Sequence, residues 1–186
     1  TLFLSSLMSD VQFKDFDILS EQDKAEAVAL LQRYDQLEKQ DGCQQDFITF
    51  IKHMWPDFIE GRHHKIIADK FNKIADGKLK RLIVCLPPRH SKSEFASTFF
   101  PAWMMGRRGN LKIIQTTHTA ELAVRFGRKV RNIIDSDDYQ HVFPDLQLQA
   151  DNKSAGRWTS NQEGEFFAAG VGGAITGRGA DLLIID

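Results

Sequence analysis

One stretch of the sequence constrains the fold more than any other: RLIVCLPPRHSKSEFA, residues 81–96. It starts with the apolar run 82–86, passes two prolines and a basic loop, and ends in the start of a helix. Such a run predicts a strand that is buried on both faces of a parallel sheet. Two further strands are predicted at 111–117 and at 182–185, the second of which closes on Asp186. RWTSN (157–161) and GEFFAAG (164–170) predict a pair of short strands around a turn near residues 162–164. Because these strands alternate with helical segments, the sequence predicts an α/β fold with a parallel sheet and flanking helices.

The part of the chain before this sheet is predicted to be helical. Apolar residues recur at helical spacing, Ser20 has the position of an N-cap, and Asp41-Gly42 is a stop signal. Helices are predicted at 20–40, 45–54 and 62–75, and later at 119–134 and from about 92, with an interruption at Pro101. We therefore divide the chain into a helical N-terminal segment, 1–78, and an α/β core, 79–186.

The charges are distributed unevenly along the chain. Residues 1–61 carry 5 basic and 12 acidic side chains, residues 62–131 carry 16 and 4, and residues 132–186 carry 3 and 9. A basic middle third between two acidic flanks indicates a surface that binds a polyanion. The alternative is that the three blocks neutralise one another in the fold.

Two observations concern the cellular compartment of the protein. No apolar run approaches the ~20 residues that a transmembrane helix needs, so no membrane partner is predicted. Cys43 and Cys85 lack the CxxC spacing of zinc and redox sites, and Cys85 lies in an apolar run. We therefore predict reduced, buried thiols in an intracellular protein.

The loop between the first strand and its helix is compared with the phosphate-binding pattern G-x-x-x-x-G-K-[S/T]. In that pattern backbone N–H groups and the lysine bind phosphates, and the hydroxyl ligates Mg²⁺. Residues 86–93 place Lys92-Ser93 in register, but both glycines are replaced. A helix start after a buried strand would still direct free N–H groups toward an anion. The loop alone is therefore either a phosphate site or a plain strand–turn–helix junction.

The last strand favours the phosphate site. Four apolar residues that close on Asp186 have the form of a Walker B strand, whose carboxylate holds Mg²⁺. Turn chemistry alone also places aspartate after strands. The presence of both motifs in one α/β chain favours a nucleotide site. We expect the amine of Lys92 and the carboxylate of Asp186 to converge at one edge of the sheet.

Three segments, RLIVCLPPRHSKSE, PAWMMGRRGNLKIIQTTHTAELA and GVGGAITGRGADLLIID, resemble in order and spacing the ATPase half of tailed-bacteriophage terminase large subunits. FIEGRHHKIIADKFNKIADGKLKR resembles the segment before the ATP loop in that family. The resemblance covers roughly residues 47–186. It implies a P-loop NTPase core and a motor that couples ATP hydrolysis to the translocation of double-stranded DNA into a procapsid.

The resemblance also implies roles for particular residues. Lys92 would contact the β/γ-phosphates, and Ser93 and Asp186 would bind Mg²⁺. Arg89 would act with Lys92 as a catalytic cation at the γ-phosphate. The residues expected to bind ATP are Pro88, Arg89, His90, Ser91, Lys92, Ser93 and, close to the adenine-binding segment, His63. For His63 the alternative is a histidine of the helix surface or of the core.

The family works as a ring on a portal protein. The expected partners are therefore duplex DNA, the portal protein, the small terminase subunit and further copies of the chain, at the procapsid portal in the host cytoplasm. The family's catalytic carboxylate follows the Walker B aspartate, and its nuclease domain lies beyond that point. The 186-residue chain, whose last residue is Asp186, is therefore expected to be a fragment with weak or no ATPase activity.

Arginines outside the loop are candidates for contacts with DNA or with a neighbouring subunit. The candidates are Arg107, Arg108, Arg125, Arg128, Arg131 and, in a glycine-rich loop at 170–179, Arg178. Three of them share one stripe of the predicted helix 119–134. The alternatives are a solvated helix face and a passive connection.

Two other functions are compatible with the sequence. A helicase-type translocase would share the strand–loop–helix core, and a helicase motif after the Walker B strand would favour it. A non-hydrolysing nucleotide- or nucleic-acid-binding module would bind ATP without turnover in the full-length protein.

Overall fold

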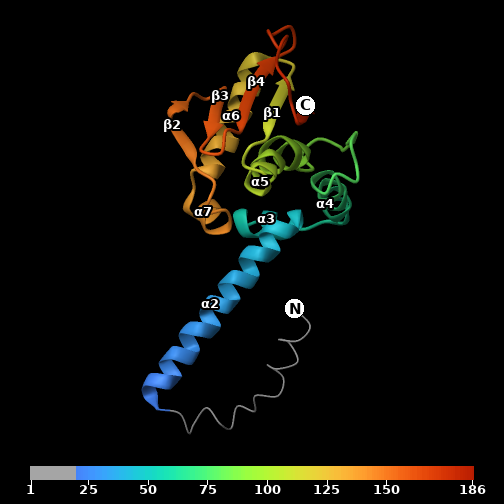
Figure 1. Ribbon diagram of the computed structural model, residues 1–186. Helices are drawn as coiled ribbons and strands as arrows, with labels where there is room; N and C mark the ends of the chain where they lie inside the picture. The colour runs from blue at the N-terminus through green and yellow to red at the C-terminus, as the bar shows by residue number, and fades with distance from the viewer. Residues whose placement is uncertain (1–19) are drawn as a thin grey trace. The chain divides into compact units, whose positions relative to one another are not determined.

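The computed structural model describes residues 20–186, the side chains of residues 150–153 excepted (Figure 1). Residues 1–19 of the predicted N-terminal segment lie outside the described residues. The chain separates into two compact units, Thr1–Lys39 and Gln40–Asp186. None of the helices formed by residues 20–186 combines the length and the hydropathy needed to span a bilayer.

The first described helix, α2 (Glu21–Gln45), begins where the sequence predicts it. The N–H of Asp23 donates to the Ser20 hydroxyl at 3.2 Å, so Ser20 caps this helix. The predicted end at Asp41-Gly42 is wrong, because the helix continues to Gln45. A glycine within a helix costs only about 1 kcal/mol. In the last turns of α2, the amides of Gln40 and Gln44 both donate to the carbonyl of Val142.

The next two helices confirm the predicted ones. They are α3 (Phe47–Met54) and α4 (Arg62–Ala75). Asp46 caps α3 by accepting hydrogen bonds from the N–H and hydroxyl of Thr49 at 2.9 and 2.7 Å. The second oxygen of Asp46 accepts from Asn72 of α4 at 2.7 Å, and Asn72 in turn accepts from the N–H of Phe47 at 2.9 Å. This exchange holds the start of α3 against α4.

The sheet has five strands in the order β2-β3-β4-β1-β5. Their bounds are β1 (Lys112–Thr117), β2 (Leu148–Lys153), β3 (Arg157–Ser160), β4 (Glu165–Gly170) and β5 (Leu182–Ile185). β1 pairs in parallel with both β4 and β5, whereas β3 is antiparallel to β2 and β4. The α/β class and the predicted pair of short strands around residues 162–164 are therefore confirmed, whereas the sheet as a whole is mixed and only β1, β4 and β5 are parallel. The short turn between β3 and β4 permits only antiparallel pairing.

The predicted strand at 82–86 is also wrong, because this segment is extended but unpaired in the described chain. Its side chains alternate, with Leu82, Val84 and Leu86 half-buried and Ile83 and Cys85 exposed. The segment lines a cavity of about 790 Å³, and β5 lines the same cavity. An apolar run forms a sheet strand only where a neighbouring strand forms hydrogen bonds with its backbone. Here the segment and β5 line a common cavity and do not pair.

Two further predictions of burial are wrong, one for Cys85 and one for the strand at 182–185. Cys43 is buried, and burial next to Asp46 raises the pKa of its thiol to about 11, but Cys85 is exposed. β5 is not buried on both faces, since Leu183 and Ile185 are 56% and 75% exposed. Only one face of this outer strand is therefore covered by the rest of the domain.

The helix after the basic loop begins at Lys92, becomes a π-helix over Glu94–Phe99, and continues as α5 (Phe100–Arg107). Pro101 does not interrupt it as predicted. It lies in the first turn of α5, directly after the π-helical turns. The changed hydrogen-bond spacing of a π-segment accommodates a residue that has no N–H to donate.

Two more helices complete the fold, α6 (Ala120–Ile134) and α7 (Asp137–Val142). α6 packs along β4 and β1 (Figure 1). Gly127 of α6 lies close to the ring of Phe166, which stacks on Trp158 at 4.9 Å. The indole of Trp158 donates to the carbonyl of Gly127 at 3.2 Å. A side chain at position 127 would prevent this close approach of helix and sheet.

Candidate functional site

The basic loop at 87–91 joins the unpaired segment to the helix that begins at Lys92, and its residues 87–90 are exposed. Arg89 and Ser91 both have positive φ, 63° and 59°. Ser91 occupies the position of the second glycine in the phosphate-loop pattern, and it adopts the left-handed backbone that glycine would adopt there without strain. This conformation costs a residue with a β-carbon about 1–2 kcal/mol.

The two groups that were expected to converge do lie together. The Lys92 ammonium is 2.7 Å from the Asp186 carboxylate. The second oxygen of that carboxylate accepts from the Ser97 hydroxyl at 2.9 Å, and the N–H of Asp186 donates to the carbonyl of Thr116 at 3.0 Å. Asp186 therefore has both its backbone and its side chain fixed at the carboxyl end of β5.

The charge of Asp186 depends on these neighbours. Burial alone would raise the pKa of this carboxyl, but hydrogen bonds from Lys92, Ser93 and Ser97 outweigh burial and lower the pKa. The group is therefore an ionised carboxylate at neutral pH, in contact with a lysine and two serine hydroxyls. An ionised carboxylate beside hydroxyl oxygens is a set of ligands suited to Mg²⁺.

Two histidines of α4, His63 and His64, lie beside the loop and its own His90. The rings of His63 and His64 are 3.8 Å apart, and His63 is 5.6 Å from His90, whose Nδ1 lies 2.9 Å from the Pro88 carbonyl. His63, a predicted nucleotide contact, is thus brought next to the loop from α4. The ring nitrogens Nε2 of His63 and His64 are buried and have no partner among the described residues.

His64 caps its own helix. Its Nδ1 accepts a hydrogen bond from the N–H of Gly61 at 2.9 Å, so this nitrogen carries no proton and Nε2 carries it. The ring is 6% exposed and lies between Phe58 and Phe95. Burial, and secondly the neighbouring His63, lower the pKa of His64 below its ordinary value.

We expect the stability of the protein to fall on mild acidification because of His64. A histidine whose pKa is lowered in the folded state binds fewer protons there than in the unfolded chain. The free energy of unfolding should therefore decrease as the pH falls below about 6.5, the ordinary pKa of histidine. Urea unfolding of the wild type and of His64→Gln, measured from about pH 7 to about pH 5, tests this.

In His64→Gln an amide oxygen can still accept from Gly61, and the decrease over this pH range should be smaller. His141→Gln serves as the control, because His141 is exposed at the end of α7. Equal pH dependence of the wild type and His64→Gln would contradict the expectation.

The six candidate arginines have different surroundings. Arg125 and Arg128 are exposed on α6. Arg131 of the same helix donates to Asn132 at 3.2 Å. The other three contact residues of their own domain: Arg107 pairs with Asp76 at 3.5 Å, Arg108 donates to the Ala75 carbonyl, and Arg178 pairs with Glu165 and covers the Phe167 ring. Arg125 and Arg128 are therefore the most available to a partner.

Sequence reasoning missed Ser97, which supports the site, and the ion pair that connects the site to α6. Ser97 follows Ser93 by one helical turn, so its contact with Asp186 could have been inferred from spacing. The ion pair between Lys129 of α6 and Glu94, next to Ser93, could not, because it depends on how α6 packs. This pair connects the helix of the basic loop with the helix that carries Arg125 and Arg128.

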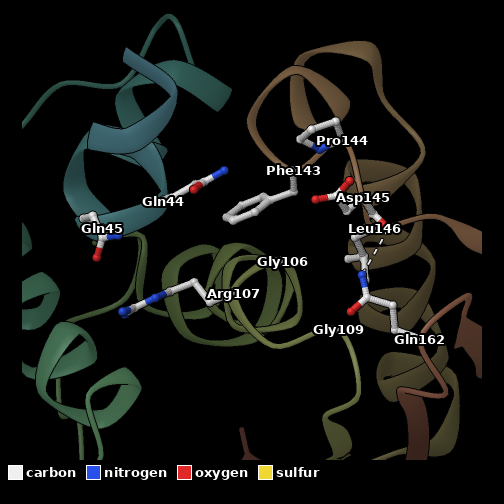
Figure 2. A pocket seen from close by; sticks show the side chains of 10 residues that line it. All are labelled: Gln44, Gln45, Gly106, Arg107, Gly109, Phe143, Pro144, Asp145, Leu146 and Gln162. Atoms are coloured by element: carbon white, nitrogen blue, oxygen red, sulfur yellow. Dashed lines mark hydrogen bonds between the residues drawn. The ribbon is translucent and has the colours of Figure 1, made fainter. Parts of the chain in front are cut away.

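A second cavity, of about 400 Å³, lies at the amino ends of β1 and β4 (Figure 2). Figure 2 shows the Phe143 ring pointing into it, between Gln44 and Arg107, while Gln162 donates to the Asp145 carbonyl at 3.1 Å. Its lining combines three glutamines and two glycines with the charged residues Arg107 and Asp145 and the apolar residues Phe143, Pro144 and Leu146. Ligands of open α/β sheets bind at the carboxyl ends of the strands. The first cavity runs along β5 and reaches Lys92 and Asp186 only at one end, and residues 87–91 do not line it. The candidate site is therefore the carboxyl edge of β5 beside Lys92.

Residues 20–186 contain no cluster of three or more His, Cys, Asp or Glu side chains suited to hold a metal ion. Comparison with known proteins gives no match to a family model, to a curated protein or to a solved structure.

Proposed function

We propose that this chain is a nucleotide-binding domain of the P-loop NTPase class, which binds Mg·ATP at the basic loop, Lys92, Ser93 and Asp186. One observation carries the proposal: Lys92 and Asp186, far apart in the sequence, pair at the carboxyl edge of the parallel strands β1 and β5. A lysine from a loop and a carboxylate from the end of an apolar strand are the two charged groups that P-loop enzymes use for phosphates and magnesium.

The side chains present fit this ligand. Mg²⁺ in nucleotide sites takes one or two protein oxygens and completes its shell with water and phosphate oxygens, and Asp186 with Ser93 supplies such oxygens. Lys92 and the N–H groups of the first helical turn are donors for phosphate.

Binding would rearrange the charges of the site. Bound Mg·ATP supplies the phosphoanhydride bond that such an enzyme hydrolyses. The Lys92 amine would exchange the Asp186 carboxylate for phosphate oxygens, while Asp186, held by Ser97, would turn its negative charge to the metal. Arg89 would add a second cation from the exposed loop.

From the resemblance to terminase large subunits, we further propose that the domain drives double-stranded DNA into a procapsid, with the portal protein, the small subunit and further copies as partners. Arg125 and Arg128 on α6 offer two exposed cations for DNA phosphates or for a neighbouring subunit. Lys129 on the same helix contacts Glu94 beside the site, which provides a route from nucleotide state to that face.

Calorimetric titration with ATP, in the presence and absence of Mg²⁺, tests the proposal without requiring turnover. The wild type should bind ATP more tightly when Mg²⁺ is present. In Asp186→Asn this enhancement should fall by about tenfold or more, because a charged ligand of the metal is lost. Asp138→Asn, an exposed aspartate of α7, is the control. No measurable ATP binding by the wild type would refute the proposal.

A further inference from the structure

Helix α2 displays an apolar stripe to solvent. The side chains of Leu30, Tyr34 and Leu37 are 62%, 42% and 55% exposed, and Ala27 precedes them on the same side of the helix. The four residues follow one another at intervals of three, four and three. A soluble domain rarely leaves such a row of large apolar side chains uncovered, and exposed apolar patches of this kind mark interaction surfaces.

The intervals are those of a coiled-coil seam. Ala27 and Tyr34 occupy the first core position, a, of two consecutive heptads, and Leu30 and Leu37 occupy the second, d. Leucine at d is the residue found at this position in two-stranded parallel coiled coils. We name these four residues the α2 seam. The seam ends where Asp23 and Asp41 take the next core positions, because like charges would face each other there.

We propose that the α2 seam pairs with the same seam of a second copy of this chain, as a short parallel coiled coil. The flanking charges argue for this occupant and this direction. Beside the seam, Arg33 occupies position g of the first heptad and Glu38 occupies position e of the second. In a parallel pair, position g of one copy lies next to position e of the following heptad in the other copy. Both copies would thus contribute an Arg33–Glu38 ion pair.

An antiparallel pair is less favourable for the same charges. It would place Arg33 opposite Arg33 of the second copy near the centre of the contact, although Lys24 would then approach Glu38. In the free chain Lys24 pairs with Glu21 at 2.9 Å on its own helix. The parallel arrangement therefore places Arg33 next to a side chain of opposite charge. Its two-fold axis makes the contact self-complementary.

The seam covers only two heptads, so the association is expected to depend on protein concentration. Sedimentation velocity of the full chain should show the apparent mass rising with concentration from 21.2 kDa toward twice that value. Leu30→Glu should abolish this rise, because it buries a charge in the seam. Val28→Glu is the matched control: Val28 is apolar and 43% exposed on the same helix, but lies outside the seam.

Circular dichroism should show that both variants keep their helix, since glutamate is a good helix former. A mass that stays at 21.2 kDa at all concentrations, or a dimer that persists in Leu30→Glu, would overturn the proposal. Loss of ATP binding would not affect it, because the seam and the nucleotide site share no residue.

Disulfide trapping tests the direction of the pair. In a chain that carries Cys85→Ser, Leu30→Cys should form a cross-linked dimer under mild oxidation, because d positions face each other in a parallel pair at a distance that a disulfide can bridge. Gln32→Cys, on the outer side of α2, should not. Cross-linking by Gln32→Cys to the same extent, or none by Leu30→Cys, would contradict the parallel seam.

Discussion

Replacing Lys92 by alanine is expected to lower the affinity for Mg·ATP by about 10- to 100-fold. The amine is held by Asp186 at the carboxyl edge of β5, and a hydrogen bond to a charged group contributes about 1.5–3 kcal/mol. The loss should be measured by calorimetric titration of the variant and the wild type under identical salt.

The control for this substitution is Lys78→Ala. Lys78 pairs with Asp76 at 3.0 Å on the exposed surface, so its removal changes the net charge equally but leaves the site intact. Two results would count against the assigned role of Lys92: equal affinities of Lys92→Ala and the wild type, or an equal loss in Lys78→Ala.

Phe47→Ala is expected to lower the free energy of unfolding by about 3–5 kcal/mol. Phe47 is fully buried, and four aromatic rings surround it at centroid distances of 5.2 to 5.8 Å: Phe71, Phe95, Phe100 and Trp103. Its removal leaves a cavity that these large rings cannot fill by small shifts. Urea unfolding monitored by tryptophan fluorescence measures the change.

The same substitution reaches the nucleotide site. Phe95, one of the four rings, lies on the helix that begins at Lys92, so loosening the cluster should also weaken ATP binding. Phe167→Ala is the comparison, because Phe167 is a half-buried phenylalanine that packs under Arg178 on the sheet. Phe167→Ala should lower the free energy of unfolding by less than half as much as Phe47→Ala. A cost below about 1 kcal/mol for Phe47→Ala would show that the cluster is not the core of the domain.

Helix boundaries could be predicted from the sequence where local chemistry sets them. Asp46 caps α3 and Gly77, with φ of 74°, follows α4, and both signals can be seen in the sequence. The strand at 82–86 was wrong because pairing depends on a neighbour that no local pattern reveals. β2 was missed for the opposite reason: LQADNK has no apolar alternation, and its pairing with β3 alone makes it a strand.

The candidate site was predicted in part for the same reasons. The Lys-Ser pair and the apolar strand that closes on Asp186 are short patterns with a fixed relation to an α/β sheet, so the convergence of the two charged groups could be expected. The contact of Lys129 with Glu94 and the approach of His63 to His90 depend on packing between distant segments. Neither can be inferred from spacing along the chain.

The outer position of β5 has a consequence for solubility. An outer strand offers N–H and C=O groups to any extended chain, and four apolar residues in a row make such an edge prone to aggregation. Asp181 and Asp186 bracket this row in the sequence, as acidic gatekeepers do in natural proteins. Asp186 is paired with Lys92, so Asp181, which is exposed, is the acidic side chain that would keep the edges of two molecules apart.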